Sequence, residues 1–261
     1  MLTKLLKHEL KATYKIFLLI FAVILFLTFA NILGVQTENV YILGLSMAAA
    51  GLAILPIIVV YAVTILQRYY NNLYGEEGYL MFTLPVKSWE IILSKYINAL
   101  IWGVLTVLVG GICVVLLVLV FLKKEVDFSL MQLIQECFKM IDIGFLFNIF
   151  LLIFFAIACF IMRVYFVISL SNLPFIRKFN ILIAIVAYFI VERIESKIGG
   201  LFLHNITGGF LENAPIYNIR VEYFMELISK ASLVAIFITT IFIILYFLGT
   251  SYITSHKLHI K

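Results

Sequence analysis

The chain has 261 residues, of which 64% are hydrophobic and only 13% are charged. A soluble domain of this size carries about a quarter charged residues, so composition excludes a water-soluble globular fold. The net charge of +5 does not indicate nucleic-acid binding, because the Lys and Arg residues of a membrane protein mainly set the orientation of its helices across the membrane. The bilayer is therefore the solvent for most of the chain, and we predict an all-α polytopic membrane protein.

The first 15 residues, MLTKLLKHELKATYK, place their leucines near one helical face and their lysines largely elsewhere. This pattern predicts an amphipathic interfacial helix at residues 1–15 that lies at the membrane surface. Two roles stay open for it. It is either an electrostatic anchor or a lever that touches a cytosolic partner.

Long apolar runs then alternate with more polar connections. A helix rises about 1.5 Å per residue, so about 20 apolar residues cross the hydrocarbon core. Six membrane spans are expected, at residues 16–33, 41–66, 97–122, 143–171, 179–198 and 231–253. The fifth is the weakest of the six, because its clean apolar part is too short to span alone. We treat the whole chain, 1–261, as a single transmembrane domain.

Residues 199–217, after the fifth run, are apolar but broken by glycines and a proline. They are expected to form an outer re-entrant or interfacial segment that packs on protein. With six spans, both termini share one side of the membrane. That side collects twelve of the nineteen Lys and Arg residues. The positive-inside rule therefore predicts that both termini are cytoplasmic.

Three charges are expected at membrane depth: Arg163 in the fourth run, and Glu192 and Arg193 at the end of the fifth. Arg163 lies eight residues, or about 12 Å, before the end of its run. Its side chain either snorkels to the inner interface, or faces a watery cavity or pairs with an acid. Glu192 is the nearest acid by depth. We expect protein or water, not lipid, to cover this end of the fifth run.

The motifs of enzymes are missing from the sequence. It has no G-x-x-x-x-G-K-[ST], no G-x-S-x-G and no H-E-x-x-H. Its three cysteines, Cys113, Cys137 and Cys159, have no metal-ligand spacing, and its four histidines lie outside the apolar runs. We therefore expect no enzymatic activity, no cofactor and no metal on this chain by itself.

The connection between the second and third runs, RYYNNLYGEEGYLMFTLPVKSWEIILSKY at residues 68–96, is far longer than a simple turn. Two glycines bracket a pair of acids, and a short apolar stretch follows that Pro85 stops. Lys87 to Glu90 restart a helix that feeds the third run, with Ser88 at its start. Two readings stay open: a cytosolic docking element, or an interfacial loop with aromatics among the lipid headgroups.

This string resembles the second-third loop of ABC-2 type permeases from Gram-positive bacteria, and GEEGYLMFTLPV is its most specific piece. The resemblance extends to the arm LLKHELKATYK and to the six-span layout, so it covers the whole chain. It implies a fold similar to that of type V exporters. It also implies a permease subunit that pairs with a second copy or a similar subunit. Two copies of a cytosolic ATPase, which carries ATP and Mg, complete the implied assembly.

In that family the second-third loop holds the coupling helix that docks on the ATPase. Carried onto this chain, the ATPase-coupling residues are Tyr74, Gly75, Glu76, Glu77, Gly78, Tyr79, Leu80, Met81, Phe82, Thr83, Leu84 and Pro85. The resemblance also implies a second cytosolic contact between the fourth and fifth spans, at Ser171, Asn172, Arg177 and Lys178.

The implied function is export across a bacterial plasma membrane. Similar permeases move amphipathic or antimicrobial peptides, phenol-soluble modulins among them, and other hydrophobic compounds are further candidates. Two alternatives stay open. A stand-alone secondary transporter would work without an ATPase, and a membrane sensor or scaffold would have no passage at all.

Overall fold

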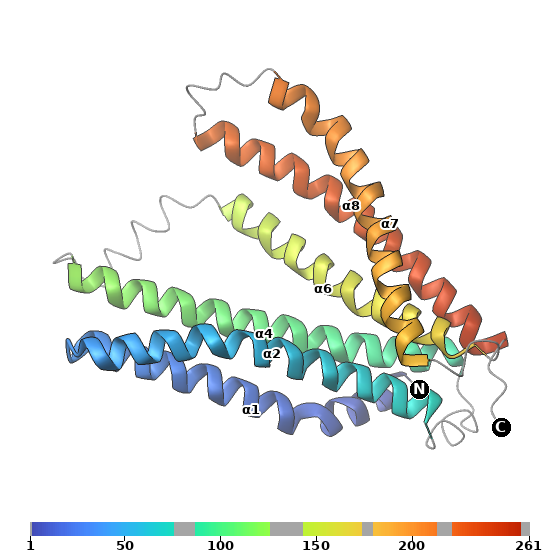
Figure 1. Ribbon diagram of the computed structural model, residues 1–261, viewed down its shortest axis with the longest axis horizontal. Helices are drawn as coiled ribbons and strands as arrows, with labels where there is room; N and C mark the ends of the chain where they lie inside the picture. The colour runs from blue at the N-terminus through green and yellow to red at the C-terminus, as the bar shows by residue number, and fades with distance from the viewer. Residues whose placement is uncertain (1, 76–86, 126–142, 174–179, 213–220, 257–261) are drawn as a thin grey trace. The chain divides into compact units, whose positions relative to one another are not determined.

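The computed structural model describes residues 2–75, 87–125, 143–173, 180–212 and 221–256 (Figure 1). All regular structure in these ranges is α-helical. The helices are α1 (Leu2–Gln36), α2 (Val40–Tyr74), α4 (Ser88–Glu125), α6 (Ile143–Ser171), α7 (Asn180–Glu212) and α8 (Val221–His256). Five of them, all except α7, are long and apolar enough to cross a membrane.

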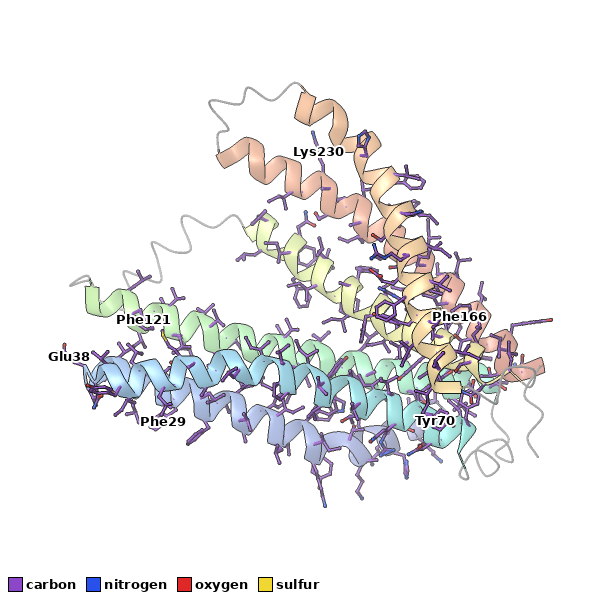
Figure 2. All side chains as sticks on the ribbon, in the orientation of Figure 1. Phe29, Glu38, Tyr70, Phe121, Phe166 and Lys230 are labelled. Atoms are coloured by element: carbon purple, nitrogen blue, oxygen red, sulfur yellow. The ribbon has the colours of Figure 1, made fainter. Side chains whose placement is uncertain are left out.

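The outward-facing side chains of these helices are apolar. Phe26 on α1 is 70% exposed, Leu45 on α2 is 76% exposed and Phe237 on α8 is 68% exposed. Phe29, labelled in Figure 2, is exposed in the same way. Water would not stabilise so much apolar surface, whereas lipid tails solvate it. The chain is therefore a polytopic helical membrane protein by composition, length and surface.

Helix α7 differs from the six-span expectation. Its first part is apolar, but Glu192, Arg193, Glu195 and Lys197 follow within two turns, and it is not among the five candidate spans. The helix then continues to Glu212 through the stretch where a re-entrant or interfacial segment was expected from residue 199. Gly199 and Gly200 weaken helical propensity without ending the helix. Residues 213–217 of that expected segment lie outside the described residues.

The N-terminal arm is not a separate interfacial helix. Helix α1 runs without interruption from the arm into the first apolar run, because no proline or glycine interrupts it before Gly34. Two arm side chains, Glu9 and Thr13, are buried against protein. At least this face of the arm is therefore covered by protein.

The contacts within the chain divide it into two compact units. One unit holds residues 1–68 and 97–141, and the other holds residues 69–96 and 142–261. The division cuts α2 and α4, whose ends nearest the 68–96 connection pack with α6. Each unit is described by itself below.

In the first unit, α1 and α2 form a tight hairpin. Glu38 adopts a left-handed backbone conformation, with φ of 55°, and reverses the chain. The Asn39 side chain then caps α2 by accepting hydrogen bonds from the backbone N–H groups of Tyr41, at 3.0 Å, and Ile42, at 3.3 Å. Deeper in the hairpin, Ser46 Oγ donates to Asn31 Oδ1 at 3.1 Å.

Gly34 allows the closest approach of these two helices. A Cβ added there would lie 2.8 Å from the Leu43 Cα and 2.9 Å from its backbone nitrogen. A backbone neighbour cannot move aside as a flexible side chain does. The hairpin therefore requires a residue without a side chain at this position.

In the second unit, α6, α7 and α8 pack against one another in pairs. Phe166 of α6 stacks on Tyr246 of α8 with ring centroids 5.5 Å apart. Nearer the other end of α6, Ser232 Oγ donates to Asn148 Oδ1 at 2.8 Å. These aromatic and polar contacts hold α8 along α6, because apolar attraction alone does not select helix partners in lipid.

We expect Gly34→Ala to lower the thermal stability of the detergent-solubilised protein, by about 1–3 kcal/mol, because the new methyl group overpacks the α1–α2 hairpin. Gly44→Ala is the matched control. A Cβ at Gly44 meets nothing within 4 Å, so the gain in helix propensity is not offset there. Thermal melting followed by circular dichroism measures both variants, and equal melting temperatures would contradict the close approach.

Candidate functional site

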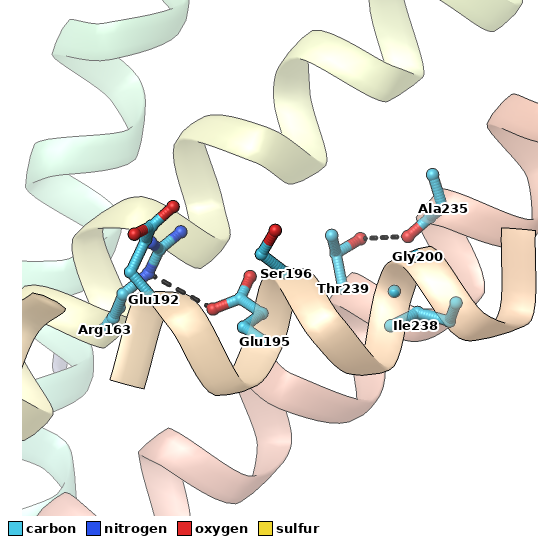
Figure 3. A pocket seen from close by; sticks show the side chains of 9 residues that line it. Arg163, Glu192, Glu195, Ser196, Gly200, Ala235, Ile238 and Thr239 are labelled. Carbon is cyan, nitrogen blue, oxygen red and sulfur yellow. Dashed lines mark hydrogen bonds and ion pairs between the residues drawn. The ribbon is translucent and has the colours of Figure 1, made fainter. Parts of the chain in front are cut away.

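A cleft with charged residues in its lining lies between α6, α7 and α8 in the second unit, with a volume of about 400 Å³ (Figure 3). Its charged lining consists of one arginine from α6 and two glutamates from α7. The lining residues are Arg163, Glu192, Glu195, Ser196, Gly199, Gly200, Ala235, Ile238 and Thr239. Each helix contributes at least one residue, so the cleft exists only when the three helices are packed together.

Glu195 is the centre of the hydrogen-bond network at this cleft. Its Oε2 lies 3.2 Å from Arg163 Nε and accepts a hydrogen bond from the Tyr246 hydroxyl at 2.9 Å. Its Oε1 accepts a hydrogen bond from the Cys159 thiol at 3.2 Å. Donors from α6 and α8 therefore converge on one carboxylate of α7. These contacts tie the three helices to one another.

Arg163 is held from two sides. Glu195 pairs with its guanidinium, and the Tyr188 ring lies 5.5 Å from its Cζ in a cation–π arrangement. Both charged side chains of the pair are only 14% exposed. Of the alternatives open for Arg163, the structure therefore shows pairing with an acid. The acid is Glu195, one helical turn beyond the Glu192 that depth alone indicated.

Glu192 lines the same cleft, because residues three apart lie on one face of a helix. Figure 3 shows Glu192 and Glu195 on α7 beside Arg163, with the dashed ion pair drawn to Glu195. Within the part of the chain that the structure describes, the Glu192 carboxylate makes no ion pair and no hydrogen bond. Arg193, the third charge expected at membrane depth, is exposed and does not line the cleft.

A second group of contacts, here called the tyrosine cluster, joins Tyr69, Lys95, Tyr165 and Ser169. The rings of Tyr69 and Tyr165 stack with centroids 3.9 Å apart, and the hydroxyls of Tyr69 and Ser169 lie 2.8 Å apart. Tyr165 also donates to the Lys95 carbonyl oxygen at 3.4 Å. The cluster therefore fastens the end of α2 and the start of α4, the two ends of the polar connection, to α6.

The first unit contains a third polar group on the N-terminal arm. Trp102 Nε1 of α4 donates to Thr13 Oγ1 at 2.8 Å, and its ring stacks on Phe17 with centroids 4.6 Å apart. Glu9, with a side chain that is 4% exposed, lies 3.6 Å from Arg68 at the start of the polar connection. The arm is thus attached to both α2 and α4.

Only the edges of the expected ATPase contacts fall on described residues. Tyr74 is the last residue of α2, and the Gly75 N–H donates to the carbonyl oxygens of Tyr70 and Asn71, both at 3.2 Å. Ser171 and Asn172 both donate from their side chains to the Ile168 carbonyl oxygen at the end of α6. The other expected contact residues, Glu76 to Pro85 with Arg177 and Lys178, lie outside the described residues.

Sequence reasoning missed several residues of these sites. Glu195 was missed because Glu192 and Glu195 lie on one face of α7 and differ in depth by only about 4.5 Å, a difference that only the packing of α7 along α6 resolves. Cys159 stands one turn before Arg163 on α6, and that i, i+4 spacing was the only signal that the two share a face. Tyr69 and Tyr165 carried no signal at all, because aromatic residues near a helix end are equally typical of the lipid interface.

Comparison with known proteins leaves the family open: no protein-family model, no curated protein and no solved structure matches this chain.

We expect Glu195→Ala to destabilise the second unit by about 3 kcal/mol or more, because it leaves the guanidinium of Arg163 without its acid. Glu192→Ala is the matched control, since Glu192 has no ion pair to lose, and its effect should stay below about 1 kcal/mol. The double variant Arg163→Met with Glu195→Met should recover most of the loss, because it removes both charges together. Thermal melting in one detergent compares all three variants, and an equal loss for both alanine variants would contradict the ion pair.

The tyrosine cluster offers a second comparison between neighbours. Tyr69 is fully buried whereas Tyr70 is 40% exposed. We expect Tyr69→Ala to cost about 3–5 kcal/mol of stability, because it opens a cavity beside Tyr165, and Tyr70→Ala to cost far less. Limited proteolysis at the 68–96 connection should be accelerated by the first change only. Equal proteolysis of the two variants would mean that the cluster does not hold the connection.

Proposed function

We propose that this chain is the transmembrane permease subunit of an ATP-driven exporter of the ABC-2 type, in a bacterial plasma membrane. In this proposal α7 crosses the membrane as a sixth span, covered by α6 and α8, and both termini are cytoplasmic. The single observation that carries the proposal is the attachment of the polar connection to α6. A connection with no mechanical role would not need both of its ends fastened to a third helix.

The tyrosine cluster and the cleft lie close together on α6. Ser169 is six residues, about 9 Å, from Arg163 along one continuous helix. A displacement of the 68–96 connection therefore has a short, rigid route to the Arg163–Glu195 pair. This route supports a coupling role for residues 74–85, in which a cytosolic ATPase docks on the connection and moves α6.

The ion pair between Glu9 and Arg68 supports the same proposal from the other unit. It ties the N-terminal arm to the start of the connection. Of the two roles left open for the arm, a lever that moves with the docking element fits this contact better than a simple surface anchor.

The cargo that suits this chain is amphipathic or hydrophobic, such as a membrane-active peptide. The partner ATPase binds ATP and Mg, and each of its two copies binds one of two permease subunits. ATP drives the cycle only through its different affinities for the open and closed states of the ATPase pair. The permease itself then needs no catalytic group.

A stand-alone secondary transporter is the second candidate. The observation that favours it is the charged cleft, because carriers place ionisable groups along their ion and substrate pathways. Uptake or efflux by the purified chain in liposomes, with an ion gradient and no ATPase, would select this candidate. Transport that requires both the ATPase and ATP would select the exporter.

We expect the double variant Glu76→Lys, Glu77→Lys to lose co-purification with its partner ABC ATPase, and to lose transport with it. Reversing two adjacent charges at an interface opposes docking through like-charge contacts. Membrane insertion and detergent stability should be unchanged. Glu38→Lys, at the exposed turn between α1 and α2, is the control and should keep both activities.

Retention of ATPase binding and transport by the Glu76, Glu77 double variant would refute the docking assignment. Failure of the wild-type chain to bind any ATPase would refute the exporter itself.

A further inference from the structure

The charges that line the cleft between α6, α7 and α8 do not balance. The positive charge of Arg163 is matched by Glu195 at 3.2 Å, and the Tyr246 and Cys159 side chains satisfy the same carboxylate. Glu192 lines the cleft as well and has no such partner among the described residues. Three ionisable groups thus leave the cleft with a formal charge of −1.

The rest of the cleft lining consists of two hydroxyl residues, Ser196 and Thr239, and of small or apolar residues. Ala235 and Ile238 belong to α8, and Gly199 and Gly200 follow the charged residues on α7. A Cβ added at either glycine meets nothing within 4 Å. The glycines therefore do not serve close helix packing here. They leave open space beside the carboxylates, in a volume of about 400 Å³.

We propose that this cleft binds a ligand with a cationic head, a primary ammonium or a guanidinium, joined to an apolar chain. Glu192 contacts the head, Ser196 and Thr239 offer hydroxyls beside it, and the apolar chain lies along Ile238 and the two glycines. The head supplies the charge that the cleft lacks.

An anionic head does not fit the same cleft. Among the described residues that line the cleft, Arg163 is the only cation, and that cation is already engaged by Glu195 and Tyr188. An anion would have to break this pair and would add to the charge of Glu192. A carboxylate among apolar helices is costly unless a cation compensates it, so the electrostatic term favours positive ligands.

The existence of the site does not depend on the proposed exporter. Only the statement that the ligand is the exported cargo rests on the proposed function. A binding measurement on the full chain, without an ATPase, therefore tests the site alone. Loss of ATPase coupling would refute the exporter and leave the binding result standing.

The test is a fluorescence titration of the full chain in phosphatidylcholine nanodiscs with a dansyl-labelled decylammonium probe. Its N-acetylated form is the neutral reference. We expect the cationic probe to bind saturably, and the acetylated probe to bind about tenfold or more weakly, because it lacks the charge-assisted contact. Glu192→Gln should weaken the cationic probe by a similar factor. Glu38→Gln, the same change on an exposed turn outside the cleft, should not.

A second variant covers the case in which Glu192→Gln fails to fold. Gly200→Leu places a side chain in the open space, where its Cβ meets nothing within 4 Å, and leucine is the better helix former. It should abolish binding of the cationic probe while the chain keeps or raises its melting temperature. The natural ligand is either a membrane lipid with an ammonium head or a cationic compound that is not a lipid, and competition with lysophosphatidylethanolamine distinguishes the two. If this lipid displaces the probe, the site binds a lipid.

Equal affinity for the cationic and acetylated probes would overturn the proposal, because charge would then play no part. Unchanged binding in both Glu192→Gln and Gly200→Leu would also overturn it, because the probe would then bind elsewhere.

Discussion

The packing of this protein depends on the constraint that its surroundings are apolar. Each helix satisfies its own backbone, and its outward side chains are as apolar as lipid, so the hydrophobic effect does not select which helices meet. Partners are instead selected by a few polar contacts and one close approach: Asn31 with Ser46, Thr13 with Trp102, Gly34 with Leu43, and Arg163 with Glu195. Each contact joins two different helices within one unit.

The same constraint explains why α7 is stable although it carries charges at its middle. An isolated helix with Glu192, Arg193, Glu195 and Lys197 within two turns is a poor membrane span. Packed against α6 and α8, it gives the carboxylate of Glu195 an ion pair with Arg163 and hydrogen bonds from Tyr246 and Cys159. The open space at Gly199 and Gly200 adjoins this polar centre and forms the cleft with it. The packing of α7 against α6 and α8 therefore both stabilises Glu195 and places charged side chains beside an open space.

Helix α6 connects the two regions with proposed roles. One stretch, from Cys159 to Ser169, supplies the thiol and guanidinium at the cleft and the tyrosine and serine that hold the 68–96 connection. A helix of this length transmits displacement with little loss, because its hydrogen-bonded backbone is stiff over a few turns. A mechanical link between the connection and the cleft thus requires no additional element. In the other unit, the burial of Glu9 and Thr13 makes the arm part of the protein interior at its attachment points.

Hydropathy and charge in the sequence alone determined that the chain is helical and membrane-embedded, and they marked Arg163 and the 68–96 connection as exceptional. These properties depend on local composition, which a linear pattern carries in full. Only the tertiary structure decided that α1 absorbs the arm, that α7 extends through its glycines, and that Arg163 pairs with Glu195. Those outcomes depend on how one helix packs against another. Residues one turn apart share a helical face and differ in depth by only about 5 Å, so the sequence does not say which of them meets a partner until the neighbouring helices are in place.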